Sequence, residues 1–223
     1  MRFTLPFLFG PRVPQEELAR HGLRYAAPGL LLALARVLLL VSIFFPYWDM
    51  ELEAPQYPNG LYLTAYVNHL TGDVREIDGL NHYIGMRPLE EAGSFERNAS
   101  IWLVVAMVLL MEGAAFIHSK WALLLALPAL LFPAVFLLDL KFWMTHFGQN
   151  LDPAAPLSAS VKPFTPTVVG EGGIGQFKTY GALCLGYWLA TASSVVALVA
   201  FYFHRRAYRP LHLASRNLGG QKQ

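Results

Sequence analysis

Charged residues are scarce in this sequence. Asp, Glu, Lys and Arg together make up 14% of its 223 residues, whereas hydrophobic residues make up 55%. An ordinary soluble domain carries about 25% charged residues. Because the apolar residues are also gathered into a few long blocks, the composition excludes most soluble folds and predicts a polytopic membrane protein.

The sequence contains a single cysteine, Cys184. It cannot form an internal disulfide, and the shortage excludes CxxC redox pairs, cysteine zinc sites, iron–sulfur clusters and CxxCH haem attachment. The surrounding residues, LCLGYW over 183–188, predict a structural thiol inside an apolar helix. The glycine-rich stretch 170–175 is not directly followed by Lys-Ser/Thr, as the phosphate-loop motif requires, which argues against nucleotide binding.

Four apolar blocks are long enough to cross about 30 Å of hydrocarbon as helices. We therefore expect an all-α membrane protein, a bundle of four transmembrane helices with a structured extracytoplasmic loop that contains a small β element. The expected spans are residues 28–48, 99–118, 121–142 and 180–204, joined outside by loops 49–98 and 143–179. An N-terminal segment 1–27, with an interfacial helix over 14–26, and a tail 205–223 complete the chain.

The distribution of charge predicts the orientation of these spans. Lys and Arg accumulate in short cytoplasmic flanks, whereas acidic residues have little effect. The tail 205–223 has five basic residues and no acid, while the loop 49–98 has nine acidic and three basic residues, a balance of −6. We expect a multi-pass protein of a bacterial or archaeal plasma membrane with both termini in the cytoplasm.

The first loop contains a segment with the composition of a strand. Residues 60–67, GLYLTAYV, show partial alternation of apolar and polar side chains, with turn signals at 59–60 and 71–73. Pro55 and Pro58 fix the backbone before this segment, so we expect a rigid, extended approach to a small β element.

The same loop contains candidate ligands for a soft metal ion. His82 and Met86 are four residues apart, so on a helical turn they would lie on one face and could bind Cu(I), with His69 as a third ligand. The alternative is structural: His82 and Tyr83 would hydrogen-bond the loop to the ends of the spans, and Met86 would fill a gap. The residues alone leave both interpretations open.

Further candidates lie in the second loop and in the spans. Met144 and His146 could complete a thioether and imidazole set, although at a helix end such residues often pack at the interface. Arg36 and Glu112 fall inside expected spans, where charges are costly. An ion pair between them would neutralise both charges, and a proton or quinol role for Glu112 is the alternative.

Two strings in the first loop are unusual: APQYP over residues 54–58 and LNHYIGM over residues 80–86. Over roughly residues 47–90 the sequence resembles the NosB-type family of polytopic membrane proteins, which are encoded with clade II nitrous oxide reductase. The resemblance implies functional roles for the motif residues, either in metal binding or in docking a partner: Tyr57, Asn81, His82, Tyr83 and Met86.

The resemblance also implies an accessory role in nitrous oxide reduction, a step of denitrification. We expect a non-catalytic factor that supports copper-centre maturation or activity of the extracytoplasmic reductase. The alternative is a quinol-linked electron-transfer membrane subunit of a respiratory complex. The expected partners are the lipid bilayer and a membrane or extracytoplasmic protein of copper or electron-transfer type, but no nucleic acid.

Other classes have less support in the sequence. An intrinsic haem is not expected, because His118, His146 and His204 all fall at span ends and not all on one side. Copper is the one cofactor that the residues suggest, and no iron–sulfur cluster is expected. Four spans without an inverted repeat leave little room for a transport site, and no acid, base and nucleophile converge as an enzyme would require.

Overall fold

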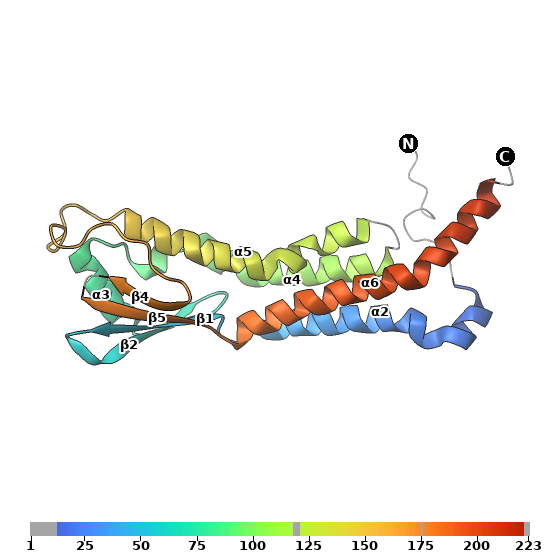
Figure 1. The fold of residues 1–223 in the computed structure, drawn as a ribbon, viewed down its shortest axis with the longest axis horizontal. Coiled ribbons are helices and arrows are strands. Elements are labelled where there is room, and N and C mark those ends of the chain that lie inside the picture. The colour runs from blue at the N-terminus through green and yellow to red at the C-terminus, as the bar shows by residue number, and fades with distance from the viewer. Residues whose placement is uncertain (1–12, 118–120, 175, 221–223) are drawn as a thin grey trace. The chain divides into compact units, whose positions relative to one another are not determined.

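The computed structural model describes residues 13–117, 121–174 and 176–220. Four helices in this part of the chain are long and apolar enough to cross a membrane. They are labelled in Figure 1: α2 (Gln15–Ser42), α4 (Ser94–Phe116), α5 (Trp121–Gln149) and α6 (Leu185–Gly220). The number of apolar helices expected from the sequence is confirmed. His118, one of the histidines considered for haem, lies outside the described residues.

Two helices extend beyond the apolar blocks that predicted them, whereas α2 ends at Ser42, before the expected end of the first span at Trp48, which begins β1. Helix α4 begins at Ser94 instead of residue 99, and α5 continues to Gln149 instead of ending near 142. A short interfacial helix is expected over 14–26, and non-helical backbone at His21 divides α2 into two helices that meet there at a kink. Hydropathy identifies the apolar part of a helix. Polar turns at either end of the helix are not apolar, so hydropathy does not predict them.

The chain divides into two compact units. The helical unit comprises Met1–Leu40, Val104–Phe132 and Ala190–Gln223, and the sheet unit comprises Val41–Leu103 and Pro133–Leu189. Helices α4, α5 and α6 each contribute to both units, because they pass from one range to the other.

Small residues on α6 allow close packing inside the helical unit. Between residues 190 and 210 its buried positions are Ala190, Ser193, Ser194, Ala197, Ala200 and Ala207. Ser193 Oγ donates to the Ala35 carbonyl of α2 at 2.7 Å, and Ser194 Oγ donates to the Ala129 carbonyl of α5 at 3.1 Å. Side chains without bulk let helix backbones approach, as is common between membrane helices.

The sheet unit is built on a five-stranded antiparallel sheet with the strand order β3-β2-β1-β5-β4. The strands are β1 (Trp48–Ala54), β2 (Tyr57–Ala65), β3 (Leu70–Gly72), β4 (Gly170–Ile174) and β5 (Phe177–Leu183). The expected β element in the first loop is confirmed, but the sheet is larger, because β5 from the second loop pairs with β1. Helix α6 therefore begins at Leu185, and Tyr180, expected at the start of the fourth span, lies in β5.

The APQYP string forms the hairpin between β1 and β2. Ala54 pairs with Tyr57, so Pro55 and Gln56 make the turn, and the turn signal expected at 59–60 falls inside β2. The register shifts between Leu52 and Ala54, which indicates a bulge in β2, and a bulge tolerates Pro58 because its unpaired residues need no backbone N–H. The prolines thus define the end of a hairpin, not an extended approach to a strand.

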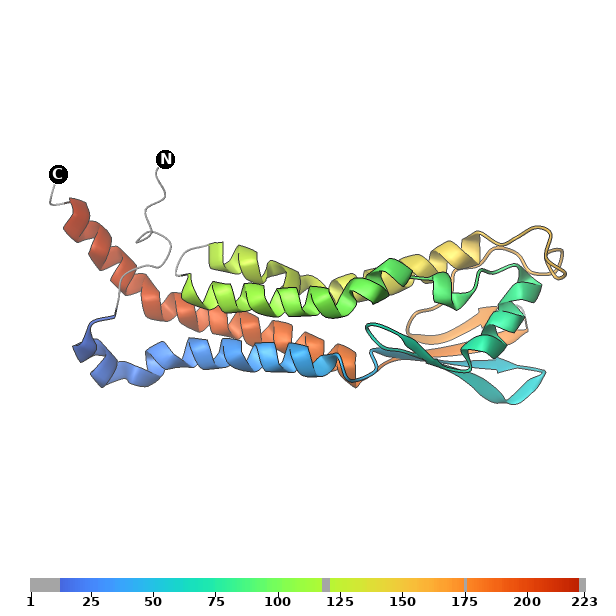
Figure 2. The same ribbon diagram turned by 180° about the vertical axis from the view of Figure 1, so that it is seen from behind.

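One face of the sheet is covered by helices. Its buried residues are Trp48, Leu52, Leu61, Leu63 and Ala65, and they form a core with Ile77 of α3 (Val74–Ile84). Partly buried side chains of α5 complete this layer: Phe136, Leu140 and Met144. Figures 1 and 2 show α3 and the second half of α5 on this side of the strands. A short 3-10 helix, η1 (Leu89–Glu91), follows α3.

Backbone hydrogen bonds tie the start of β1 to the start of α6. The Cys184 amide donates to the Tyr47 carbonyl at 3.0 Å, and the Gly186 amide donates to the Pro46 carbonyl at 2.7 Å. Tyr47 is fully buried, and burial raises the pKa of its phenol to about 12, although a hydrogen bond with Ser42 opposes the shift. Cys184 precedes α6 instead of lying inside it, contrary to the sequence prediction.

Candidate functional site

The LNHYIGM string forms the C-terminal end of α3. Gly85 adopts left-handed backbone with φ of 81°, and its amide donates to the His82 carbonyl at 3.4 Å. The Met86 amide donates to the Asn81 carbonyl at 2.8 Å. This pair of bonds is a Schellman cap, which favours glycine because a β-carbon is strained at positive φ.

The capped end of α3 holds the second loop by its backbone. The Asp152 amide donates to the Gly85 carbonyl at 2.7 Å, and the Leu157 amide donates to the Tyr83 carbonyl at 3.0 Å. A β-carbon at Gly85 would lie 2.6 Å from the Asp152 carbonyl oxygen. The string is therefore a packing junction between the two loops of the sheet unit.

Asn81 also has a structural role. The residue is 7% exposed, and its side-chain amide donates to the Asp78 carboxylate at 3.4 Å. The same carboxylate oxygen accepts the backbone N–H of Leu89 at 2.8 Å. These contacts join the last turns of α3 to η1. They explain why Asn81 is buried, and no bound ligand is needed for that explanation.

The shared helical face expected for His82 and Met86 is not formed. Helix α3 ends at Ile84, and the left-handed Gly85 turns the chain before Met86, so the two residues do not share a helical face. His82 is exposed, while Met86 is half-buried. The sequence argument failed because it continued the helix through a glycine whose conformation ends it.

His69 has local partners. Its Nδ1 lies 2.7 Å from the Asn68 side-chain oxygen, and its ring stacks on Tyr66 with 4.4 Å between centroids. These contacts suit a histidine that stabilises the turn between β2 and β3.

The candidates of the second loop are held by packing. Met144 contacts the core of the sheet unit. The ring of His146 is stacked against Phe142 with 5.8 Å between centroids, and its Nδ1 lies 3.3 Å from the Asn150 amide nitrogen. Among the described residues, no three His, Cys, Asp or Glu side chains are grouped so that they could hold a metal ion.

The face of the sheet opposite the core carries a row of acidic and aromatic side chains. Strand pairing places Glu171, Tyr180, Glu51 and Tyr62 side by side on β4, β5, β1 and β2. The Tyr62 hydroxyl donates to Glu51 Oε1 at 2.9 Å, and this bond to a carboxylate raises the pKa of the Tyr62 phenol. Alternation along β1 puts Asp49 on the same face. We call this surface the outer face.

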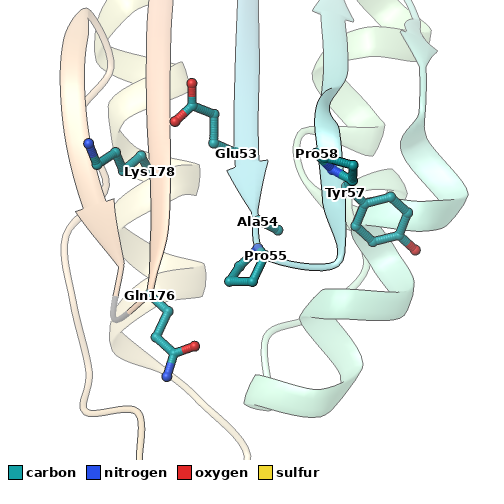
Figure 3. Close-up of a pocket in the computed structure, with 7 residues that line it drawn as sticks. All are labelled: Glu53, Ala54, Pro55, Tyr57, Pro58, Gln176 and Lys178. Carbon is teal, nitrogen blue, oxygen red and sulfur yellow. The ribbon is translucent and has the colours of Figure 1, made fainter.

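The outer face continues to the ends of the two hairpins. Glu53 pairs with Lys178 on β5, so the face carries four carboxylates, on Asp49, Glu51, Glu53 and Glu171, and the ammonium of Lys178. An open pocket of about 360 Å³ lies at this end (Figure 3). It is lined by Glu53, Ala54, Pro55, Tyr57, Pro58, Gln176 and Lys178. Most of the APQYP string thus lines a pocket beside a charged surface.

Sequence reasoning missed the second-loop half of the outer face. Tyr180 was assigned to a span, and the stretch around Glu171 was considered only as a phosphate loop. A signal was present, because residues 177–183, FKTYGAL, follow a glycine-rich stretch and alternate between the two faces. Tyr57 was singled out by its motif, and it both lines the pocket and packs partly against the core.

Arg36 and Glu112 form an ion pair inside the helical unit. Arg36 Nη1 of α2 contacts Glu112 Oε2 of α4. The side chains are 18% and 48% exposed, respectively. The pair places opposite charges together in apolar helices, and this pairing lowers the free-energy cost of burying each charge.

No family model, no curated protein and no solved structure matches this chain.

Proposed function

We propose that this chain is a non-catalytic membrane accessory protein of nitrous oxide respiration, which docks an extracytoplasmic protein on its outer face. In this proposal the four apolar helices cross the plasma membrane of a bacterium or archaeon, and both termini are cytoplasmic. The two loops that build the sheet then lie outside. The link to nitrous oxide rests on the APQYP and LNHYIGM strings.

The observation that carries the docking function is the row of acidic and tyrosine side chains across four strands. Tyrosine combines a large apolar ring with a polar tip and is enriched in protein interfaces. Four carboxylates against one ammonium favour a partner with lysine and arginine on its contact surface, because complementary charge steers association. The backbone of a paired sheet also holds these side chains in fixed register.

The described contacts favour docking over a copper site made by this chain alone. Asn81, Gly85 and Met86 belong to the cap of α3, and His69 and His146 have neighbouring side chains as partners. Copper maturation would then be supported through the bound partner. The reductase itself is the first partner to test, because the resemblance places the two proteins in one process.

The test is complementation in a nitrous-oxide-respiring host from which the gene has been deleted. Each variant is compared for nitrous oxide consumption and for the copper content of the purified reductase. The outer-face variant is Glu51→Gln/Glu171→Gln. The matched control is Glu90→Gln/Glu91→Gln, which removes the same charge from exposed positions at η1.

We expect the outer-face variant to lower nitrous oxide consumption and the control to behave as wild type. Binding of purified reductase should weaken as ionic strength rises, because exposed charges are screened. Wild-type consumption by the outer-face variant would contradict docking. Loss of reductase copper in a His82→Ala/Met86→Ala variant, with a functional outer-face variant, would replace docking with direct copper handling.

A further inference from the structure

The ends of α2 and α6 in the helical unit carry a cluster of arginines. Its five members are exposed: Arg20, Arg24, Arg205, Arg206 and Arg209. Two carboxylates, Glu16 and Glu17, precede them in the first turn of α2. Figures 1 and 2 both show α2 and α6 running side by side in the helical unit. We call this group the arginine cluster.

Direct contacts join its two halves, which are far apart in the sequence. Arg24 Nη2 donates to the Arg206 carbonyl at 3.1 Å. The rings of Tyr25 and Tyr208 meet edge to face with 5.7 Å between centroids. The cluster is therefore one surface made by two helices, not two independent tails.

The cluster concentrates positive charge, because its five arginines outnumber the two carboxylates of Glu16 and Glu17. Arg205 and Arg209 are four residues apart on α6, a spacing at which like charges repel. Within the described part of the chain, none of the five arginines forms an ion pair with a carboxylate. A bound anion would relieve this repulsion, and the planar guanidinium group suits phosphate because it can donate two parallel hydrogen bonds.

Apolar side chains adjoin the cluster on the same helices. Leu23, Leu30, Tyr202 and Phe203 are exposed beside it. A free phosphate ion would use only the guanidinium groups, whereas a phospholipid would use both the charged and the apolar surface. Tyr25 and Tyr208 fit this arrangement, since tyrosine is enriched at the level of lipid headgroups.

We propose that the arginine cluster binds the headgroup of an anionic phospholipid, whose acyl chains lie along the exposed apolar side chains of α2 and α6. The site belongs to the helical unit and is independent of the docking function proposed for the outer face. The basic ends of α2 and α6 would thus bind a lipid headgroup in addition to orienting the helices in the membrane.

The test uses the full chain in nanodiscs of phosphatidylcholine alone or of phosphatidylcholine mixed with phosphatidylglycerol. The protein is then extracted in mild detergent, and retained lipids are counted by native mass spectrometry. The test variant is Arg205→Gln/Arg209→Gln. The matched control, Arg75→Gln/Arg87→Gln, removes the same charge from exposed positions of the sheet unit.

We expect wild type and the control to retain phosphatidylglycerol in preference to phosphatidylcholine. Each arginine near a membrane surface contributes about a fivefold preference for anionic lipid, so the test variant should lose roughly 25-fold. Equal retention by wild type and the test variant, or an equal loss in the control, would overturn the proposal.

A second variant, Arg205→Lys/Arg209→Lys, keeps the charge that orients the helices. It should keep most of the preference, because the electrostatic part of binding survives. If it loses phosphatidylglycerol as completely as the glutamine variant, charge does not hold the lipid and the proposal fails. Inorganic phosphate added during extraction should not displace the lipid, and complete displacement would assign the cluster to free phosphate instead.

Discussion

Replacing Gly85 with alanine tests whether the LNHYIGM string is a packing junction. Gly85 has φ of 81°, and left-handed backbone costs a residue with a β-carbon roughly 1–2 kcal/mol. The new carbon would also lie 2.6 Å from the Asp152 carbonyl oxygen, so the hydrogen bond from Asp152 to Gly85 must give way, at about 1 kcal/mol. The two costs sum to about 2–3 kcal/mol of unfolding free energy.

The chain offers a matched control in the same helix. A β-carbon at Gly79 meets nothing within 4 Å, and this glycine lies inside α3. Gly79→Ala should therefore stabilise the protein by roughly 0.5–1 kcal/mol, because glycine loses the most conformational freedom in a helix. The two substitutions add the same methyl group and should act in opposite directions.

Thermal unfolding in detergent and hydrogen exchange measure the two effects. For a chain of this size, 2–3 kcal/mol corresponds to a fall in Tm of roughly 4–12 °C. In Gly85→Ala the amides of Asp152 and Leu157 should also exchange faster, since their acceptors are at the end of α3. An unchanged Tm in Gly85→Ala, or an equal fall in Gly79→Ala, would refute the junction.

Two further predictions concern charge. Glu112→Gln should destabilise the protein by about 3 kcal/mol, because it leaves Arg36 uncompensated, and Arg36→Met/Glu112→Leu should recover most of this loss in the same unfolding assay. Burial, together with the neighbouring Asp49 carboxylate, raises the pKa of Cys184 from 9.0 to about 11. At pH 8 iodoacetamide should react about tenfold more slowly with native than with denatured protein, because the native thiolate is scarcer but more nucleophilic, and Asp49→Asn should accelerate the native reaction; equal native and denatured rates would contradict this account.

Local composition was enough to predict the helices but not their ends. Apolar blocks indicate membrane helices because each residue that faces lipid must itself be apolar, and this property is visible one residue at a time. The polar first turns of α4 and the last turn of α5 do not need to be apolar. Only the structure therefore showed where these helices begin and end. The cost of isolated charges in apolar helices likewise suggested that Arg36 and Glu112 would meet.

The candidate site depended on contacts between distant segments. Glu51 and Tyr180 are adjacent because β1 pairs with β5, and no local pattern in either strand specifies that partner. The shared helical face expected for His82 and Met86 was wrong for a local reason, since Gly85 ends α3 before Met86.

The sequence by itself determined the apolar helices, the β element of the first loop and the concentration of acidic residues there, because each is a property of neighbouring residues. Only the tertiary structure decided which strands share a sheet, which face carries the acidic and tyrosine row, and how Arg24 meets Arg206. Packing and hydrogen bonds between segments far apart in the chain set those arrangements. Such contacts form only in the folded chain, so no single stretch of sequence specifies them.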